Sequence, residues 1–432
     1  MPRHTSLLLP LIIYAATGPS ARGADVDYFP PPDSQGGWRT LTTEDDIRRV
    51  AGLDLQKLDD AFAHVQKTTK NGGLLVARRG WLVYERYFGK GHRDALCNLA
   101  SCGKSITSVA VGILMAERPD LFPDGLDQKI FTPTYFPPAA FPLSDPRKSE
   151  IKLGQLLSFS AGIRGNNPCY VRGKEVTIDP AGPDGWQAMV DDIALGKRDV
   201  KSGGRPISAA TLWCEPGGGY SYATGSIHMA SVMLRHITGR EMQDYVDEKI
   251  ARPLGWERWT YAYKNAKEVT HTPGGGGIAL RGPDMLRFGY LLLKEGRWRD
   301  EQVVPADYVR HCRSQSPFNP HYPYSLQFNV NTDGGEPRLP RDAFWKSGSG
   351  YHCLFVVPSL DLVVWKLGGR DPQYGAADVG LPVLPHVEAA QQNRGGWKAA
   401  ADPEDRTKTL ELVLEALVDR EAAEGAAGNA GR

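Results

Sequence analysis

The apolar positions of this chain recur with two periods, and each period predicts a different kind of element. Short runs rich in β-branched and aromatic residues predict two strands at residues 73–78 and 81–88, which a two-residue turn joins into a hairpin. Two further runs of this kind, 351–357 and 362–367, lie near the other end of the chain. Apolar residues at helical spacing predict helices over residues 54–66, 103–116, 227–237, 284–293 and 404–422.

The order of these elements indicates the fold class. Strands lie at both ends of the chain and helices lie between them, so we predict an α+β fold. In this fold an antiparallel β-sheet is built from the N- and C-terminal strands and flanked by helices, with a mainly helical region inserted between them. No long low-complexity linker, charge block or internal repeat divides the chain, and we therefore expect a single domain over residues 41–425.

The first residues have the pattern of a secretory signal. An apolar run over residues 7–17 follows Arg3 and His4, and small residues around position 23 offer a cleavage site. The run is much shorter than the roughly 20 apolar residues that span a bilayer. We expect a signal peptide at 1–23 and a Pro/Gly-rich arm at 24–40, with ordered structure beginning only at the helix 54–66. We expect the protein to be exported, either periplasmic or secreted, and to have no stable membrane span.

Composition and charge narrow the partners. The chain has 432 residues, of which 41% are hydrophobic, and this is enough to bury a large core. Lys and Arg number 51 against 50 Asp and Glu, so no overall field attracts nucleic acid or an anionic membrane. We expect a small-molecule ester, amide or short peptide substrate. The six cysteines form no C-x-x-C pair and predict no zinc or thiol-redox site, and their disulfide pairing stays open.

The first chemical motif is Ser101-Cys102-Gly103-Lys104, an S-x-x-K pattern at the start of a predicted helix. Residues three apart share a helix face, so the lysine amine lies within reach of the serine hydroxyl. A lysine takes a serine proton only where burial or positive charge lowers its pKa. Residues 103–105 match the last three residues of a phosphate-binding P-loop. That motif requires glycine at the position of Asn98, so the nucleotide-binding interpretation fails. Cys102 is expected to be a buried packing residue.

Two further motifs follow in order. Tyr220-Ser221-Tyr222-Ala223-Thr224 lies between a glycine-rich turn and a predicted helix, which places Tyr222 on a loop. Lys346-Ser347-Gly348 comes just before the predicted strand 351–357. The chain has no G-x-S-x-G sequence, and this disfavours a hydrolase of the α/β type.

With these three motifs in this order, the sequence resembles the serine β-lactamase and penicillin-binding superfamily, in particular its class C β-lactamase and esterase-like branch. Residues 156–163 and 276–298 are similar to further segments of that family. The resemblance covers most of the mature chain and implies a β-lactamase/transpeptidase-like fold. The family's second motif is Tyr-x-Asn, whereas this chain has Thr224 in place of the asparagine.

The resemblance implies roles for individual residues. Ser101 would be the nucleophile, Lys104 would accept or stabilise its proton, and Tyr222 would relay a proton to the leaving group, and which of Lys104 and Tyr222 is the acylation base stays open. Lys346 would raise the local positive potential and attract a substrate carboxylate.

Substrate-binding and oxyanion roles are implied for the residues next to these. Ser347 would offer a hydroxyl, Gly348 would allow a close approach of substrate, Thr224 would face the substrate, and the backbone N–H groups of Ser101 and Ser349 would form the oxyanion hole. No metal and no cofactor are implied. We expect His228, His271 and His352 to be structural residues that line a pocket at most, and residues 273–277 to form a tight substrate-side loop.

These observations favour a serine hydrolase acting on carboxylic esters or small amides. Thr224 alters the motif that binds the amide side chain in β-lactamases, and the long segment 168–206 is expected to build a pocket of its own. One alternative is a D-amino-acid peptidase or β-lactamase acting on cell-wall peptides or β-lactams, which Lys346 and export favour. Another is a penicillin-binding-like sensor module that is acylated without turnover.

Overall fold

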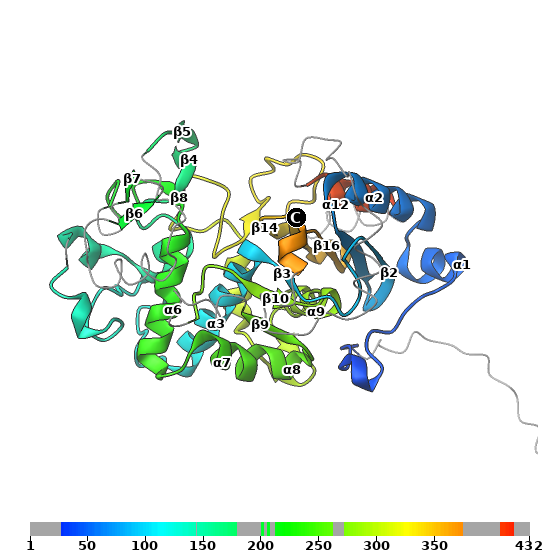
Figure 1. The fold of residues 1–432 in the computed structure, drawn as a ribbon, viewed down its shortest axis with the longest axis horizontal. Coiled ribbons are helices and arrows are strands. Elements are labelled where there is room, and N and C mark those ends of the chain that lie inside the picture. Colours follow the sequence, from blue (N-terminus) through cyan, green and yellow to red (C-terminus); the bar gives the residue numbers. More distant parts are fainter. Residues whose placement is uncertain are drawn as a thin grey trace, which may run out of the picture.

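The largest sheet of the described residues is antiparallel and six-stranded, with the strand order β13-β14-β15-β16-β1-β2. Figure 1 shows its strands β14, β16 and β2 to one side of the helices α3 (Gly103–Glu117) and α6 (Thr224–Thr238). The computed structural model describes residues 27–143, 145–178, 200–202, 205–207, 212–261, 272–374 and 407–418. The strands of the sheet are β13 (Asn329–Val330), β14 (Phe344–Gly348), β15 (His352–Val357), β16 (Leu362–Leu367), β1 (Gly72–Arg78) and β2 (Trp81–Phe88). Because β1 pairs with β16, strands from the two ends of the chain meet inside one sheet, and the predicted α+β fold is confirmed.

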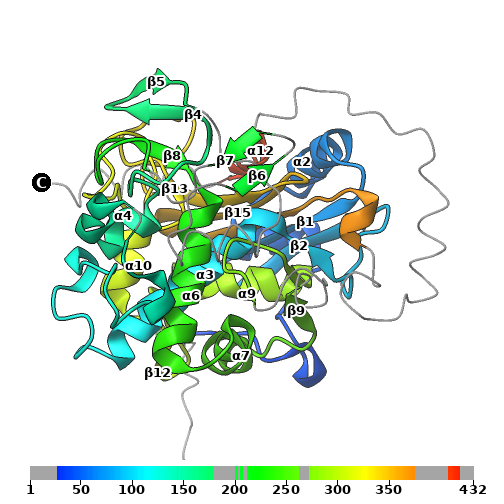
Figure 2. The same cartoon turned by 60° about the vertical axis from the view of Figure 1, so that its left-hand side comes forward.

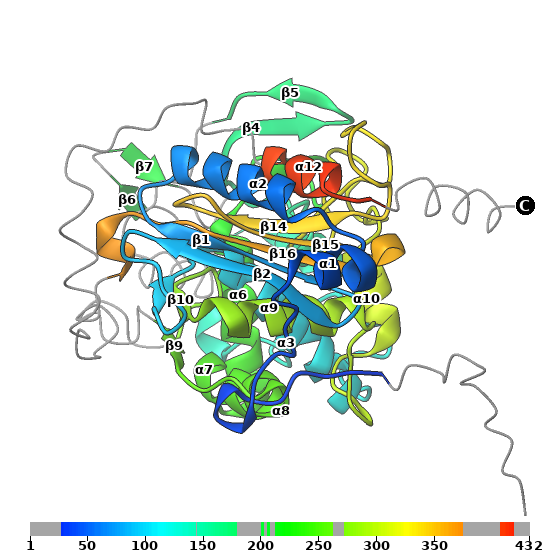
Figure 3. The ribbon, with the colours of Figure 1, turned by 90° about the vertical axis from the view of Figure 1, so that its right-hand side faces the viewer.

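Helices cover both faces of this sheet. Figure 3 shows α2 (Leu55–Thr68) and α12 (Lys408–Glu415) over one face and α9 (Gly282–Leu293) over the other. Side chains alternate between the faces of a strand, so Leu74 and Val76 join the apolar core under α2 and α12, whereas Leu75 joins the larger core that contains α9. A slip of one residue would exchange the two faces, and burial on both sides therefore fixes the register.

The predicted hairpin is confirmed as β1 and β2, which pair antiparallel. Its two-residue turn consists of Arg79 with φ 54° and Gly80 with φ 74°. Positive φ at both central residues is the geometry of a type I′ turn, whose twist matches that of the flanking strands. The predicted strands 351–357 and 362–367 are confirmed as β15 and β16.

The helical region lies beside the sheet and positions the candidate site. α3 (Gly103–Glu117) packs against α6 (Thr224–Thr238), and Figure 2 shows both helices beside the sheet. α3 is buried from Gly103 to Leu114, so it is a core helix. The other elements of the described residues are α1 (Glu44–Asp46), α4 (Leu153–Leu157), α7 (Met242–Val246), α8 (Arg252–Leu254), α10 (Ala306–Cys312), β3 (Cys97–Asn98), β4 (Asn166–Val171), β5 (Lys174–Val176), β6 (Val200–Ser202), β7 (Arg205–Ile207), β8 (Tyr220–Tyr222), β9 (Trp259–Tyr261), β10 (Ile278–Leu280), β11 (Arg297–Trp298) and β12 (Glu301–Gln302).

All four helices predicted within the described part are confirmed, as α2, α3, α6 and α9. The helix predicted over 404–422 is present only as α12, Lys408–Glu415, and it ends earlier than predicted, because residues 416–418 are described and are not helical. Residues 404–406 and 419–422 lie outside the described residues. The strand β14 was not predicted. The third motif therefore lies inside a strand and not in the connection that precedes one.

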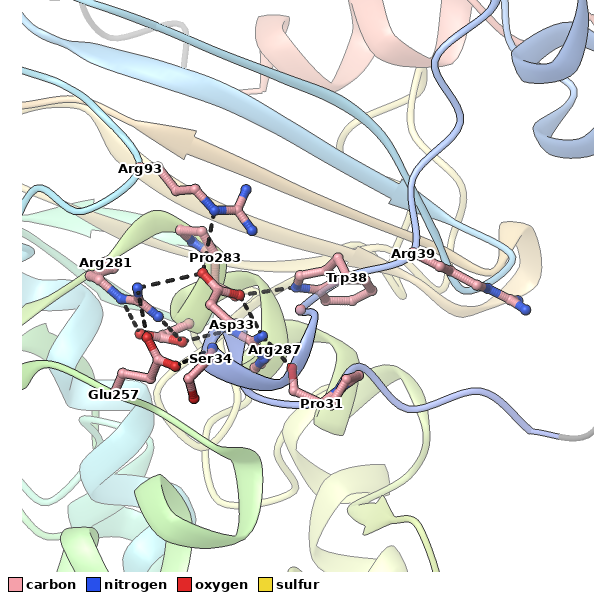
Figure 4. A network of polar contacts seen from close by, with 12 residues as sticks. Pro31, Asp33, Ser34, Trp38, Arg39, Arg93, Glu257, Arg281, Pro283 and Arg287 are labelled. Atoms are coloured by element: carbon pink, nitrogen blue, oxygen red, sulfur yellow. Dashed lines mark hydrogen bonds and ion pairs between the residues drawn. The ribbon is translucent and has the colours of Figure 1, made fainter.

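The Pro/Gly-rich arm is folded onto the domain from residue 27 onward, so the expectation that ordered structure begins at residue 54 is wrong. Trp38 is 4% exposed and belongs to the larger core. Asp33 lies among three arginines of the domain and accepts a hydrogen bond from Arg287 Nη2 at 2.8 Å, with Arg93 and Arg281 also within ion-pair distance (Figure 4). Trp38 and Asp33 are thus two of the contacts that hold the arm against the domain.

The predicted signal peptide at 1–23 lies outside the described residues. Within the described ranges, no helix combines the length and the apolar character that crossing a membrane requires. All six cysteines lie in the described part, where each is a free thiol.

Candidate active site

Ser101 lies in a tight turn at the start of α3. The turn is a short 3₁₀ helix (Ala100–Cys102) held from both sides, because Leu99 N–H donates to the Ile278 carbonyl at 2.8 Å and Ala100 N–H donates to Asn98 Oδ1 at 2.9 Å. Ala100 has φ 48°, a left-handed conformation that costs a residue with a Cβ about 1 kcal/mol. Such a conformation persists where the surrounding structure over-determines it, and it sits here directly before the candidate nucleophile.

Lys104 points back at this turn. Its Nζ lies 2.8 Å from Ser101 Oγ and donates to the Gly275 carbonyl at 2.5 Å. The side chain is 1% exposed, and this burial lowers the pKa of Lys104 from 10.5 to about 7. Near neutral pH a large fraction of the molecules therefore carries an unprotonated amine whose lone pair can accept the Ser101 proton.

The glycine-rich run 273–277 forms the floor beneath Lys104. Gly275 N–H donates to His228 Nδ1 at 2.9 Å, and the Gly274 carbonyl accepts from Thr107 Oγ1 at 2.6 Å. A Cβ on Gly275 would lie 2.4 Å from His228 Cε1, so only glycine fits. The run is buried, and its Gly275 carbonyl holds the Lys104 amine, so it lies directly beside the candidate site.

Two of the three candidate pocket histidines, His228 and His352, lie in the described residues. His228 accepts from the glycine-rich run, as described. His352 is fully buried, its Nδ1 accepts from Gly368 N–H at 3.0 Å, and burial lowers the pKa of His352 to about 3, so the ring is neutral at physiological pH. His271 lies outside the described residues. The structure describes no cluster of three or more His, Cys, Asp or Glu side chains able to hold a metal ion.

Tyr222 was predicted on a loop, but it is the last residue of the strand β8, and it lies between two lysines. Its hydroxyl is 3.4 Å from Lys346 Nζ, and its ring centroid is 5.3 Å from Lys104 Nζ and 5.2 Å from Lys346 Nζ. When protonated, an amine at these distances from an aromatic ring is favourably placed for a cation–π contact. The three motifs of the sequence thus come together at one point, from α3, β8 and β14.

The strand β14 brings Lys346 and Gly348 to the Ser101 turn. A Cβ on Gly348 would lie only 2.3 Å from the Leu99 carbonyl oxygen, so the approach requires glycine. The neighbouring strand β13 pairs with Phe344 and Trp345. Ser347 and Gly348 pair with β15, the strand on the other side of β14.

Ser349 follows the end of β14 and is tied to the nucleophile turn. Gln373 Nε2 donates both to the Ser349 carbonyl at 3.0 Å and to the Asn98 carbonyl at 2.8 Å. This amide connects the strand end to the residue that holds Ala100. The backbone N–H groups of Ser101 and Ser349 were predicted as oxyanion donors, and the two residues lie on segments that this contact joins.

Thr224 and Cys102 complete the set of predicted residues. Thr224 is the first residue of α6, and its methyl group faces Gly275, 2.6 Å from where a Cβ of that glycine would lie. Cys102 is fully buried, and this raises the pKa of its thiol to about 12, so it is an inert packing residue as predicted. Residues 179–199 and 203–204 of the segment expected to build a pocket lie outside the described residues.

Sequence reasoning missed Tyr324. This residue lies between α10 and β13, is 1% exposed, and accepts a hydrogen bond from Lys346 Nζ at 2.6 Å. Its ring stacks on Phe159 with centroids 5.4 Å apart and planes 15° apart. No periodicity or motif marks Tyr324 in the sequence, because its partner Lys346 is on a strand that was not predicted.

Comparison with known proteins relates the chain to one family model and to several solved structures. The model described as Beta-lactamase matches residues 58–379. A penicillin-binding protein homologue from Caulobacter crescentus aligns with a TM-score of 0.52 at 16% identity, covering 73% of this chain and 95% of that chain. EstCE1, described as a hydrolase with promiscuous acyltransferase activity, aligns with a TM-score of 0.53 at 17% identity over 78% and 98% of the two chains.

The octameric penicillin-binding protein homologue from Pyrococcus abyssi gives a TM-score of 0.51 at 15% identity over 76% of this chain and 78% of that chain. Identities this low establish a shared fold and no more. No curated protein matches the sequence significantly.

Proposed function

Because this chain belongs to the Beta-lactamase family of serine hydrolases, we propose that it hydrolyses carboxylic esters or small amides through an acyl-enzyme formed on Ser101. The observation that carries the proposal is the 2.8 Å distance between Lys104 Nζ and Ser101 Oγ, at a lysine that burial keeps partly unprotonated near neutral pH. A serine becomes a competent nucleophile when such a base adjoins it.

In the proposed acylation, Ser101 Oγ attacks the substrate carbonyl carbon while Lys104 accepts the hydroxyl proton. The tetrahedral oxyanion takes hydrogen bonds from the backbone N–H groups of Ser101 and Ser349. Tyr222 then gives its proton to the leaving alcohol or amine, and the proton held by Lys104 restores the tyrosine hydroxyl. Water next attacks the acyl group and releases the acid, with Ser101 recovering its proton.

The preference for esters and small amides over β-lactams and peptides has two supports. Thr224 lacks the amide that the family's asparagine offers to a substrate amide, and its methyl group faces the buried Gly275. Lys346 is 1% exposed and already donates to two phenol groups, which favours a role beside Tyr222 over capture of a substrate carboxylate. The description of EstCE1 as a hydrolase with acyltransferase activity is compatible with the same acyl-enzyme chemistry.

The test is hydrolysis of p-nitrophenyl acetate and butyrate by the wild-type protein, Ser101→Ala and a matched control, Ser105→Ala, with nitrocefin and a D-alanyl-D-alanine dipeptide run in parallel. Ser105 is a buried serine of the same helix whose hydroxyl donates to the Cys102 carbonyl. We expect Ser101→Ala to lose at least about 10³-fold in kcat, as for other serine nucleophiles, and Ser105→Ala to retain turnover. Turnover that survives in Ser101→Ala would refute the nucleophile, and faster cleavage of nitrocefin or the dipeptide would refute the substrate class.

A further inference from the structure

A buried series of hydrogen bonds leads from the core of the domain to the Tyr222 hydroxyl. Lys346 Nζ donates to Tyr324 Oη at 2.6 Å and to Tyr222 Oη at 3.4 Å. The Tyr324 hydroxyl donates to Gln327 Oε1 at 3.3 Å, and Gln327 Nε2 donates to the Leu157 carbonyl at 2.6 Å. Lys346, Tyr324 and Gln327 are each at most 1% exposed. Through Tyr324 and Gln327, these contacts fix the position of the Lys346 amine.

The phenol oxygen of Tyr324 is a hydrogen-bond acceptor for the Lys346 amine. Tyr324 is a neutral partner of Lys346, because burial raises the pKa of its phenol well above the usual 10.0. Its hydrogen is engaged by Gln327, so the oxygen presents lone pairs to Lys346. The Tyr324 oxygen thus accepts from the same Lys346 amine that donates to Tyr222 Oη.

The position of Tyr324 does not depend on its hydroxyl alone. Its ring stacks on Phe159, and the Lys346 amine lies 5.1 Å from its centroid. Gln327 has φ 72°, an unfavourable conformation for a residue with a Cβ. Backbone strain of this kind is kept where the surrounding structure requires the residue in place. Here it serves a side chain that orients the Tyr324 hydroxyl.

We propose that Tyr324 is a positioning residue of the hydrolytic reaction, which holds the charged Lys346 against Tyr222 while Tyr222 passes its proton to the leaving group. The proposal rests on the proposed function, since it presupposes a leaving group released at Tyr222. As the Tyr222 O–H bond breaks and the proton joins the leaving oxygen or nitrogen, negative charge develops on the tyrosine oxygen. The Lys346 ammonium group stabilises that charge.

The proposed role of Tyr324 predicts an effect on the rate that depends on the leaving group of the substrate. A poor leaving group needs the proton of a general acid, whereas p-nitrophenolate departs readily without one. Loss of the Tyr324 hydroxyl therefore slows acylation selectively for esters of poor leaving groups. A purely structural role of Tyr324 would slow both kinds of ester alike.

The experiment compares kcat/KM for ethyl butyrate and p-nitrophenyl butyrate, which share one acyl group, in the full-length protein and in Tyr324→Phe. We expect the value for ethyl butyrate to fall about 10- to 100-fold, in the range of lost general-acid assistance, and the value for p-nitrophenyl butyrate to fall less than about 3-fold. The matched control is Tyr308→Phe, which removes another buried hydroxyl, one that donates to the Ser108 carbonyl at 2.7 Å. In the control the ratio of the two values stays unchanged.

A second variant, Gln327→Met, removes the acceptor of the Tyr324 proton and shifts the same ratio in the same direction, and it decides the question if Tyr324→Phe does not fold. An unchanged ratio in folded protein overturns the role of Tyr324. A fluorophosphonate probe separates the two proposals, since it labels a reactive serine without an ester leaving group. Labelling of Ser101 with an unchanged ratio overturns only the role of Tyr324, whereas absence of both labelling and ester turnover overturns the proposed function and this inference with it.

Discussion

Replacing the buried Lys104 by an apolar residue is expected to raise the stability of the protein and to abolish its activity. Burial lowers the pKa of Lys104 from 10.5 to about 7. Between these two values the unfolded chain binds more protons than the folded protein, so the free energy of unfolding rises with pH across that window. The unfavourable contribution of Lys104 is therefore fully present below pH 7 and disappears above pH 10.5.

The magnitude follows from the size of the shift. A difference of about 3.5 pKa units corresponds to about 5 kcal/mol at 1.36 kcal/mol per unit. Lys104→Met removes this contribution and also the hydrogen bond to the Gly275 carbonyl, which is worth about 2 kcal/mol for a charged donor. We expect the variant to be more stable than the wild-type protein by about 3 kcal/mol at pH 6, with the advantage lost by about pH 10.

The assay is urea unfolding of both proteins at pH 6 and pH 9.5, followed by circular dichroism, together with the pH dependence of ester turnover. For the wild-type protein, kcat/KM rises with pH to a plateau with an apparent pKa of about 7, and Lys104→Met is inactive at each pH. The control is Lys148→Met: burial lowers the pKa of Lys148 to about 8, so it shares the direction of the stability change and keeps ester turnover. A stability difference between wild type and Lys104→Met that is independent of pH would refute the reasoning.

Two further substitutions test the packing around the site and the arm. Gly348→Ala places a methyl group 2.3 Å from the Leu99 carbonyl and pushes β14 away from the nucleophile turn, so we expect kcat/KM for p-nitrophenyl butyrate to fall about 10- to 100-fold. Asp33→Asn removes the carboxylate that accepts from Arg287 in a buried ion-pair cluster, and chemical unfolding is expected to show a loss of about 3 kcal/mol.

Each of these two substitutions has a matched control. Gly335→Ala introduces a methyl group whose nearest neighbour is 3.4 Å away, in Asp333, and leaves kcat/KM unchanged. Asp46→Asn changes an exposed carboxylate that pairs with Arg49 in water-screened surroundings, and chemical unfolding is expected to show no measurable loss of stability. Equal effects of a test substitution and its control would contradict the packing or the ion-pair argument.

The parts of the fold that sequence predicts are those with a local signal. The hairpin β1–β2 and the helices α3, α6 and α9 have apolar patterns of the right period, so their existence and approximate bounds follow from residues that are neighbours in the chain. Ser101 and Lys104 come together for the same reason, because three residues of helix separate them. β14 was missed, since Lys346, Ser347 and Gly348 interrupt any apolar pattern over its five residues.

The parts that sequence does not predict depend on contacts between distant segments. The Gly275 carbonyl that holds Lys104 comes from a loop 171 positions along the chain. Tyr324 reaches Lys346 across 22 positions, from a segment without regular structure. Asp33 accepts from Arg287 across 254 positions. Such pairings arise from the packing of whole elements, and no short motif records them.

The central claim is that Ser101 carries the acyl group, and intact-protein mass spectrometry after rapid acid quenching tests it most directly. The wild-type protein mixed with excess p-nitrophenyl butyrate is predicted to gain the mass of one butyryl group, located by peptide mapping on Ser101, while Ser101→Ala gains none. A butyryl group found on another residue of the turning-over protein, or equal labelling of the Ser101→Ala variant, would contradict the account.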